Sequence, residues 1–421
     1  MKEQQFDVLI VGAGMIGSAM ANALGSANLS VALFDQKAPS PFNPSSLPDI
    51  RVSALSYASE QILTQLGAWK FMQAMRMCPY QQMAVWEKLS TPLARGPNRM
   101  NKTLFDAADI GHPQLGFIVE NSITQRALHQ AMSRYPGIRS FCPNVIQRID
   151  PGADQPSITL SDGRRFTGQV IIGADGANSA VRQAANIGLN RQDYEQQCLV
   201  ATVEIDAPQA ITWQAFTPTG PESFLPLPSV GGRHYASVVW YHHPDKVAAL
   251  KSLSDRDFIT TLAQTFPAEL PAIKQLHGRA SFPLARRHAQ TYYKKGVVLA
   301  GDAAHTINPL AGQGVNLGFQ DVAWLAEILV DAHRVGEDIG NPDVLARYEK
   351  NRRPDNQRMM TIMDGFYHTF SNDHFPLKVI RNIGLTLAGR FTPAVKQVMK
   401  YAMGLSGKQP RLAQGLPVTL R

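Results

Sequence analysis

The feature that most constrains this chain is a strand, a glycine-rich turn and a helix at its very start. Residues 6–11 are a short apolar run of the kind that forms a buried parallel strand. An Ala-rich helical stretch covers residues 18–27, and a second apolar strand, 30–34, ends at Asp35. The turn carries the spacing GxGxxG, with Gly12, Gly14 and Gly17.

Each part of this unit suits a dinucleotide. Glycine lets the backbone approach a pyrophosphate, the helix N-terminus offers free N–H groups, and a carboxylate accepts from a ribose hydroxyl. The unit therefore predicts a Rossmann-like βαβ fold with a bound dinucleotide. The alternative is a glycine turn with no ligand, and the pattern alone does not distinguish FAD from NAD.

A second glycine-rich stretch makes that distinction. An apolar run over residues 296–300 predicts another buried strand, and Asp302 and His305 follow it. An acid at a strand end can bind a polyol hydroxyl, and the positive end of a helix dipole favours an anion. The ribityl chain of a flavin requires such a hydroxyl acceptor, and the N1/O2 edge of a reduced flavin is such an anion. The alternative interpretation is a loop that only caps a helix. The loop that begins the next helix contains Pro309, Gly312, Gln313, Gly314, Val315 and Asn316.

A third motif lies between the other two. The sequence DGANSAVR follows an apolar strand over residues 169–172 and places Asp175, Ser179 and Arg182 in the pattern DGxxSxxR. By itself it could be a turn in which Ser179 caps a short helix. Its position between two glycine-rich motifs makes it a further candidate for cofactor contact.

Charge is distributed unevenly along the chain. The 421 residues include 41 Lys+Arg and 33 Asp+Glu, a formal net charge of +8. Residues 377–421 contain no Asp or Glu, and their cations are Lys378, Arg381, Arg390, Lys396, Lys400, Lys408, Arg411 and Arg421. These eight account for the whole excess, because 41 − 8 = 33. The body is then formally neutral, which argues against a nucleic-acid partner, since such proteins gather basic residues around their cleft.

The remaining composition limits the class of protein. Hydrophobic residues make up 44% and charged residues 18%, as in a folded chain of more than one structural unit. The three cysteines, Cys78, Cys142 and Cys198, have no metal-ligand spacing, so no metal site is expected. We find no secretory signal pattern and no run of 18 apolar residues. We therefore expect a cytoplasmic protein.

Together the three motifs resemble those of the class A flavoprotein aromatic monooxygenases, the group of para-hydroxybenzoate hydroxylase. More narrowly, HTINPLAGQGVNLGFQD at residues 305–321 is similar to the signature of the ubiquinone-biosynthesis hydroxylases. Four further stretches resemble that subfamily: MRMCPYQQMAVWE, GFIVEN, WQAFTPTGPESFLPL and FPLARRHA.

The resemblance implies a role for each candidate residue. The three glycines of GxGxxG would carry the FAD pyrophosphate and Asp35 the adenosine ribose. Asp175 would lie by the pyrophosphate and Asp302 by the ribityl chain. Arg51 and Gln125 match family residues near FAD. Pro309 and the backbone from Gly312 to Asn316, which includes Gln313, Gly314 and Val315, would face the isoalloxazine ring. His305 belongs to the motif, but a structural role is at least as plausible for it as a catalytic one.

The resemblance also implies the reaction. Members of the family reduce FAD with NAD(P)H, form a flavin C4a-hydroperoxide with O2 and hydroxylate an electron-rich ring. The implied substrate is a polyprenyl benzoquinol, 2-polyprenyl-3-methyl-6-methoxy-1,4-benzoquinol. The alternatives are a sister hydroxylase acting at another carbon, a soluble small-phenol hydroxylase and a non-catalytic flavin-binding accessory subunit. No catalytic residue is assigned: Tyr235, Tyr241, His234 and His242 could be a base, but packing or surface roles suit each better.

We expect an α/β fold with a discontinuous FAD-binding domain over residues 1–70, 105–190 and 283–340. Residues 71–104 and 191–282 would form a substrate domain with a mixed β-sheet. Residues 341–421 would be a helical region whose basic amphipathic tail contains two short helices separated at Pro393. The tail's apolar stripe could pack on the protein itself or on a second subunit. Alternatively, it could contact the inner face of an anionic membrane, where a prenylated substrate and other ubiquinone-biosynthesis proteins would be met.

Overall fold

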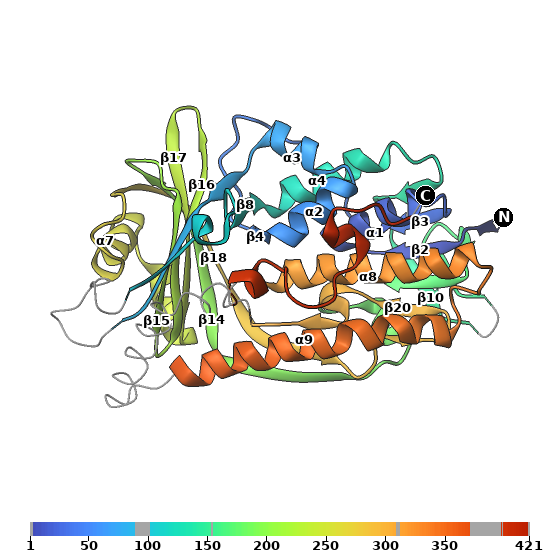
Figure 1. The fold of residues 1–421 in the computed structure, drawn as a ribbon. Helices are drawn as coiled ribbons and strands as arrows, with labels where there is room; N and C mark the ends of the chain where they lie inside the picture. The colour runs from blue at the N-terminus through green and yellow to red at the C-terminus, as the bar shows by residue number, and fades with distance from the viewer. Residues whose placement is uncertain are drawn as a thin grey trace.

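The computed structural model describes residues 3–88, 102–152, 155–308, 312–370, 397 and 399–419. Two bodies lie side by side along the long axis of the molecule (Figure 1). One contains parallel strands sandwiched between helices, and the other is a large sheet with two short helices. The expected α/β architecture is confirmed.

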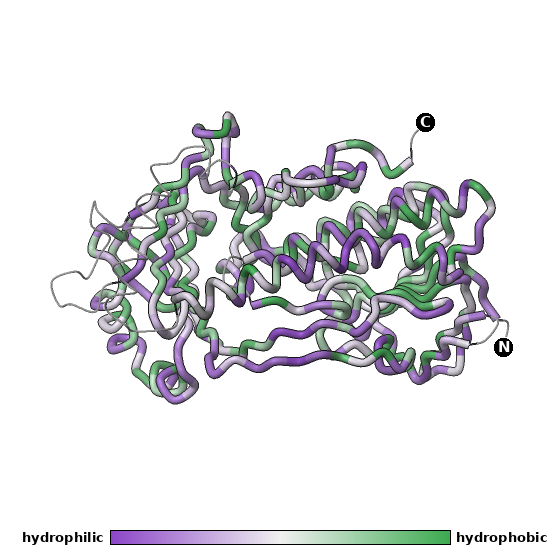
Figure 2. The backbone as a smooth tube through the Cα atoms, turned by 60° about the horizontal axis from the view of Figure 1, so that its bottom comes forward, coloured by the Kyte–Doolittle hydropathy of each residue, from purple (hydrophilic) through white to green (hydrophobic). Residues whose placement is uncertain are grey.

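The first body is built on a six-stranded sheet with the order β19-β20-β13-β2-β3-β9. Neighbours from β20 to β9 run parallel, and every residue of β2, β3, β13 and β20 is buried. The strands form a hydrophobic bundle in Figure 2. Parallel strands share the edge at which their carboxyl ends lie, so the loops after them meet there. The bounds are β2 (Val8–Val11), β3 (Val31–Phe34), β9 (Ile138–Phe141), β13 (Val170–Gly173), β19 (Tyr293–Lys294) and β20 (Val297–Leu299).

Helices and two small sheets enclose this parallel sheet. The helices are α1 (Met15–Gly25), α2 (Tyr57–Gln65), α3 (Trp69–Met75), α4 (Asn121–Met132), α5 (Ala180–Ala184), α8 (Gly314–Arg334) and α9 (Pro342–Phe370). One small sheet joins β4 (Val52–Ser56), β8 (Gly116–Glu120) and β5 (Cys78–Tyr80). The other joins β1 (Gln4–Gln5), β12 (Arg165–Thr167), β11 (Ser157–Leu160) and β10 (Ile146–Asp150).

The second body is an eight-stranded sheet with the order β21-β18-β14-β17-β16-β15-β6-β7. One face packs under α6 (Pro244–Ser252) and α7 (Asp255–Thr265) through a core that includes Trp240 and Phe258. Its opposite face meets the first body. The strands are β6 (Gln82–Glu87), β7 (Thr103–Asp106), β14 (Leu189–Ile205), β15 (Ile211–Thr217), β16 (Gly220–Val230), β17 (Arg233–His242), β18 (Ile273–Ala289) and β21 (His305–Thr306).

Two long strands connect the bodies. β14 and β18 each span 17 residues and pair with each other from Leu189–Ala289 at one end to Ile205–Ile273 at the other. The domain boundaries expected at 190/191 and 282/283 therefore fall inside strands. The first body also includes α3, whose Trp69 and Met72 lie in its core, whereas residues from 71 on were assigned to the substrate domain.

The C-terminal segment, residues 399–419, packs on the first body across α2 and α8 (Figure 1). Arg411 pairs with Glu327 and Asp331 of α8, and the Lys408 ammonium lies over the Trp324 ring. Two cations of the predicted basic tail are thus engaged by the body. The other described tail cation, Lys400, is exposed; residues 371–396, which hold most of the predicted amphipathic stripe, are outside the described part of the chain.

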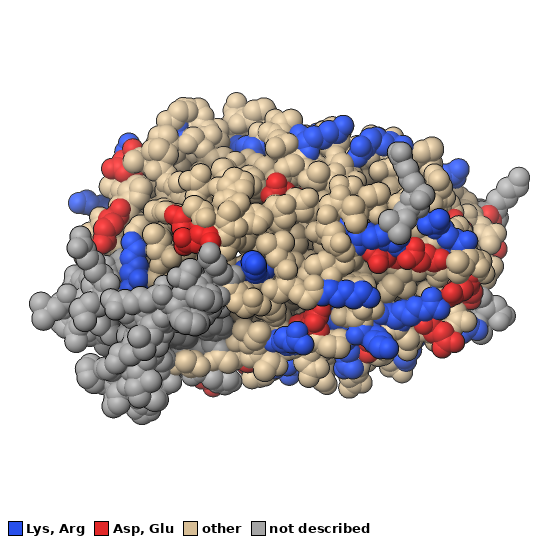
Figure 3. All heavy atoms as spheres, in the orientation of Figure 1, with Lys and Arg blue, Asp and Glu red and all other residues tan. Residues whose placement is uncertain are grey.

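Lys and Arg alternate with Asp and Glu over α8 and α9 on the face in Figure 3. Among the described residues no helix is long and apolar enough to span a membrane. The short 3-10 turns are η1 (Ala107–Ile110), η2 (Gly301–Ala303) and η3 (Arg411–Gln414).

Candidate functional site

The glycine-rich turn after β2 lies against the turn after β13. A Cβ atom on Gly12, which has a φ of +101°, would lie 2.4 Å from the Ala174 carbonyl oxygen. A Cβ on Gly17 would lie 1.8 Å from the Gly12 carbonyl oxygen, so both glycines are required by packing. Gly14 differs, because a Cβ there would meet no atom within 4 Å, and no side chain caps the start of α1. Gly14 and the first N–H groups of α1 therefore face open space suited to an anion.

Asp35 and Gln125 both hold the glycine turn at Ala13. The Ala13 N–H donates to Asp35 Oδ2 at 2.7 Å, and Gln125 Nε2 donates to the Ala13 carbonyl at 2.7 Å. His129, which the sequence analysis did not single out, lies 3.1 Å from the same carbonyl. Burial lowers the pKa of His129, so it is neutral at pH 7. Sequence could have found it only through its position one helical turn after Gln125 on α4.

Asp175 combines a capping role with an unused oxygen. Its Oδ2 accepts from the Ala180 N–H at 2.7 Å, and Ser179 caps the same helix by accepting from the Arg182 N–H at 3.0 Å. Asp175 Oδ1 is buried without a hydrogen-bond partner. Arg182 donates to the Ala303 carbonyl at 2.9 Å and so ties this turn to the end of β20.

Asp302 follows β20 at the same edge of the sheet. Its side chain is accessible to solvent, yet it is recessed enough among protein atoms that desolvation raises the pKa of its carboxyl. The positive groups that oppose this pKa shift are His305, Arg51 and Arg287. Arg51, at the start of β4, is itself exposed. Arg51 therefore lies near enough to Asp302 to favour the charged form of its carboxyl.

The N-terminus of α8 completes the edge. Its N-cap, Gln313, makes no side-chain cap bond, and a Cβ on Gly314 would meet no atom within 4 Å. Gly312 has a φ of +62° and would bring a Cβ within 3.4 Å of Ala54. Asn316 turns its side chain to β4 and α2, accepting from Ser56 N–H at 3.0 Å and donating to the Ala54 carbonyl. Pro309 is outside the described residues; Val315 follows Gly314 in the first turn of α8.

A buried carboxylate that the sequence motifs did not single out holds the residues that follow β20 in place. Asp321 of α8 is fully buried, and burial is outweighed by nearby positive groups, so its pKa is lowered. It lies 2.5 Å from His305 Nε2 and accepts from Arg352 Nε at 2.8 Å. The Gly301 N–H and Asn356 also donate to it. His305 is therefore a buried structural histidine beside Asp302. The sequence signal was an acid at a position of the apolar face of α8, between Leu317 and Leu325, where a charge needs a buried partner.

The sheet face that meets the first body carries buried hydroxyls without partners. Cross-strand neighbours Thr202 and Ser237 both have unpaired hydroxyls, as does Tyr241 further along β17. Tyr235 packs with residues of β4 and β8, and Tyr241 with residues near α8 and α9, which shows that both face the first body. Alternation along β17 directs His234 and His242 to the opposite face.

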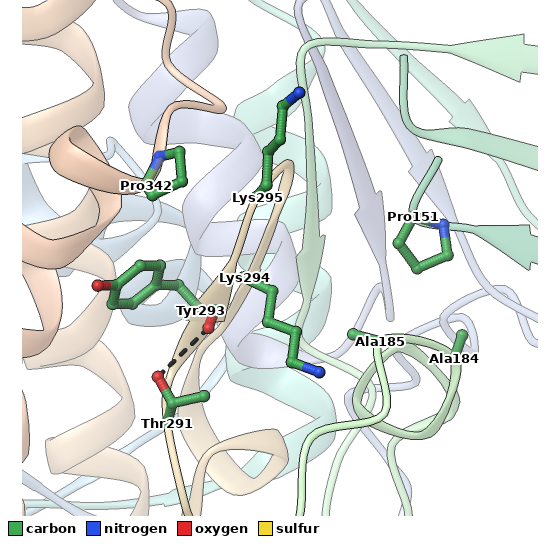
Figure 4. A pocket seen from close by; sticks show the side chains of 8 residues that line it. All are labelled: Pro151, Ala184, Ala185, Thr291, Tyr293, Lys294, Lys295 and Pro342. Atoms are coloured by element: carbon green, nitrogen blue, oxygen red, sulfur yellow. Dashed lines mark hydrogen bonds between the residues drawn. The ribbon is translucent and has the colours of Figure 1, made fainter. Parts of the chain in front are cut away.

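A further pocket lies elsewhere on the molecule. It measures about 540 Å³ and is lined by Lys294 and Lys295 of the β19–β20 hairpin together with Ala184 and Pro342 (Figure 4). Lys294 already donates to the Asn186 carbonyl. The pocket adjoins the amino end of β20, opposite to Asp302, so it is not part of the edge described above.

Comparisons with known proteins agree with this geometry. A family model described as an FAD binding domain matches residues 5–362. The 3-demethoxyubiquinol 3-hydroxylase of Escherichia coli is 40% identical over 96% of this chain and 100% of its own length. The ubiquinone hydroxylase UbiL of Rhodospirillum rubrum is 34% identical over 98% of this chain and 93% of its own.

A solved structure shares the fold. The p-nitrophenol 4-monooxygenase PnpA of Pseudomonas putida superposes with a TM-score of 0.78 at 17% identity, covering 96% of this chain and 100% of that one. The two chains therefore share their overall fold.

Proposed function

The chain belongs to the family of proteins that carry this FAD-binding domain, and from that premise we propose that it is an FAD-dependent aromatic-ring monooxygenase that hydroxylates a polyprenyl benzoquinol in ubiquinone biosynthesis. The proposed substrate is 2-polyprenyl-3-methyl-6-methoxy-1,4-benzoquinol, with NAD(P)H and O2 as cosubstrates. The observation that carries the proposal is the 40% identity to a 3-demethoxyubiquinol 3-hydroxylase over that enzyme's full length. The edge of the parallel sheet supplies the chemistry that such an activity needs.

The residues at that edge fit FAD. Open space at Gly14 and Gly314 lies at two helix N-termini, where a pyrophosphate and a flavin edge would find N–H donors. The unpartnered oxygen of Asp175 and the recessed carboxyl of Asp302 are acceptors for hydroxyl groups. We propose that these residues, with Asp35 on the ribose, hold the cofactor, and that Gly12, Gly17, Arg51 and Gln125 shape its site. Pro309 and the 312–316 backbone, through Gln313, Val315 and Asn316, would face its ring.

Bound FAD would accept hydride from NAD(P)H and activate O2; the protein's own groups orient the substrate and exclude water. The sheet face over the edge is suited to a quinol. Thr202 and Ser237 carry buried hydroxyls on this face that have no hydrogen-bond partner in the protein. Burial raises the pKa of Tyr241 well above 10, so it can donate a hydrogen bond but does not serve as a base near neutral pH.

The charges on this sheet face help to distinguish a quinol substrate from the alternative, a small phenol that carries a carboxylate. Between Cys198 and Glu204 on β14, and between Tyr235 and Tyr241 on β17, the described residues include no Lys or Arg. A carboxylate buried between these two stretches would find no counter-charge on them, which is costly; the neighbouring strand β18 carries Arg286 and Arg287, further along the sheet. A neutral quinol therefore suits the face better than an aromatic acid.

The test is turnover by the purified FAD-loaded protein under ¹⁸O2. Addition of the quinol is expected to stimulate NADH or NADPH oxidation and to give a product heavier by one ¹⁸O atom. A non-catalytic accessory subunit would show no flavin reduction. Flavin reduction without ring oxygenation of this quinol, but with oxygenation of an earlier pathway phenol, would identify a sister hydroxylase instead.

Localisation is part of the same proposal. We infer that the protein works at the inner face of the membrane, where a polyprenyl quinol resides, through the cations of its C-terminal region. The support is the sequence of residues 377–421, which has eight cations and no acids. Contact with other ubiquinone-biosynthesis proteins at that surface remains a prediction from the family resemblance.

A further inference from the structure

We propose that a methionine-lined cavity beside the loop of residues 312–316 binds the first part of the substrate's isoprenoid chain. The cavity lies between the strands β5, β6 and β7 and the C-terminal segment, and its volume is about 110 Å³. This inference rests on the proposed function, because it assigns a place to the apolar tail of the proposed quinol. Its apolar walls come from Tyr80, Met83, Phe105, Leu115, Met399 and Met403.

The inner end of the cavity borders the candidate flavin site. Gln313 and Asn316 of the α8 N-terminus line it, as does Ala54 of β4. Ala54 also lies against Gly312, at 3.4 Å from the position of a Cβ there. A substrate ring held near residues 312–316 could therefore direct its isoprenoid substituent straight into this cavity, because no other side chain layer lies between Gly312 and the cavity-lining Ala54.

The chemistry of the walls suits a hydrocarbon chain. None of the described residues that line the cavity is charged. The side chain of Asn316 is engaged with Ser56, Ser59 and Ala54, so it does not demand a polar ligand. Methionine is unbranched and polarizable, and it adapts to apolar groups of irregular shape. An anionic headgroup would find no counter-charge among these walls, whereas an isoprenoid unit would find apolar contacts on each side.

The volume suits one isoprene unit. An apolar cavity of about 150 Å³ binds benzene, so about 110 Å³ is the scale of one small hydrocarbon group. The rest of the chain has a continuation, because a groove of about 530 Å³ between α8, α9 and the C-terminal segment shares Ser56, Gln313, Asn316 and Ala402 with the cavity. Trp324, Met359 and Tyr401 line that groove, and so do the charged side chains of Lys350, Arg352, Asp355, Arg358 and Lys408, so the groove is a mixed polar exit rather than an apolar tunnel.

The C-terminal segment forms a wall that is held in place. The Ala58 N–H of α2 donates to the Met403 carbonyl at 3.1 Å, and Met399 and Met403 are buried against Leu115 and Ala107. This wall therefore has a fixed position, and enlarging one of its side chains should narrow the cavity.

The experiment compares prenylated quinol with the same quinol bearing a methyl group in place of the chain. Met403→Trp is expected to lower the ratio of their kcat/KM values about tenfold or more, the scale at which apolar pockets discriminate between substrates. Met83→Phe narrows the cavity from the opposite wall and should act in the same direction, so misfolding of one variant does not decide the test. The matched control is Met75→Trp, the same change at a half-buried methionine of α3 that does not line the cavity, and it should leave the ratio within twofold.

A binding measurement gives a readout independent of turnover. Calorimetry on the FAD-loaded protein should show that a quinone with a three-unit isoprenoid chain binds more tightly than its methyl analogue, and that Met403→Trp removes this difference. Equal loss for both ligands in both cavity variants, or an unchanged ratio, would overturn the chain site. Wild-type oxygenation of neither quinol would instead overturn the proposed function, and the chain site with it.

Discussion

At the residue scale, the chemistry of this protein depends on side chains whose partners belong to other elements. Asp321 comes from α8, yet its hydrogen-bond partners come from the turn η2, from β21 and from α9. Asp175 caps α5 with one oxygen and leaves the other unpaired. Sequence spacing identified the candidate cofactor residues, but not the buried groups that support them.

Asp321→Asn is expected to destabilise the protein by about 3–5 kcal/mol, because it leaves the buried Arg352 and His305 without their anion. FAD affinity should fall as well, because Gly301 and His305 flank Asp302. The measurements are chemical denaturation and FAD titration. Asp355→Asn is the control: it changes a half-exposed partner of the same arginine, and its effect should stay below about 1 kcal/mol.

The ion pairs of Asp321 also predict how the stability of the protein depends on pH. The folded-state pKa of Asp321 is lowered below its unfolded value. Its contribution is therefore fully present above the unfolded pKa of about 3.9 and is lost as pH falls through the folded value. Acid unfolding of the Asn variant should show a weaker dependence on pH below about 4. An identical slope in both proteins would contradict this assignment.

Gly14→Ala should separate folding from cofactor binding. The added methyl group meets no protein atom, and the backbone conformation, with φ −69°, suits alanine. We expect unfolding free energy within about 0.5 kcal/mol of wild type but weaker FAD binding, measured by flavin fluorescence. Gly365→Ala in α9, which also meets no neighbour, is the control and should leave FAD binding unchanged. Wild-type FAD affinity in Gly14→Ala would argue that the cofactor does not lie over Gly14.

At the element scale, the position of the C-terminal segment on α8 decides the shape of the cavity and the groove. Sequence showed a basic, periodic tail, and the structure engages two of its cations in contacts with the body. An ion pair between segments distant in sequence has no local signal. The long strands β14 and β18 likewise join two domains that the positions of the sequence motifs would separate.

Arg411→Ala is expected to loosen this segment without unfolding the protein. It removes the ion pairs with Glu327 and Asp331. Because Asp331 is half-exposed, the free energy of unfolding should fall by only about 1.5 kcal/mol. Hydrogen exchange should increase selectively over residues 399–419. Arg347→Ala, which removes an exposed pair with Glu337, serves as the control and should leave exchange in that segment unchanged.

At the scale of the whole molecule, net charge is carried by the tail rather than by the body. The visible face over α8 and α9 mixes both signs (Figure 3), and the eight tail cations equal the net charge of +8. Because Lys408 and Arg411 contact the body, the cations before them are the candidates for a lipid surface.

Replacing Lys378, Arg381, Arg390 and Lys396 with Gln should weaken binding to anionic liposomes, since each nearby cation contributes about 1 kcal/mol. The change keeps the segment over residues 399–419, which a truncation after Asp373 would remove. Cosedimentation at two salt concentrations measures the effect. The control replaces four exposed cations of the body with Gln: Arg148, Arg164, Arg191 and Arg347. Equal losses in both variants would show that net charge, and not the tail, governs binding.

The sequence by itself determined the parallel sheet, its glycine turns and the carboxylates after its strands, because these follow from local periodicity and from backbone requirements at single positions. GxGxxG, DGxxSxxR and the loop from Asp302 to Asn316 could each be found without knowing the fold. Only the tertiary structure decided that Asp321 supports that edge, that Tyr235 and Tyr241 face it while His234 and His242 do not, and that Met399 and Met403 line a cavity beside it. These depend on which distant elements pack together, and packing is set by the whole chain.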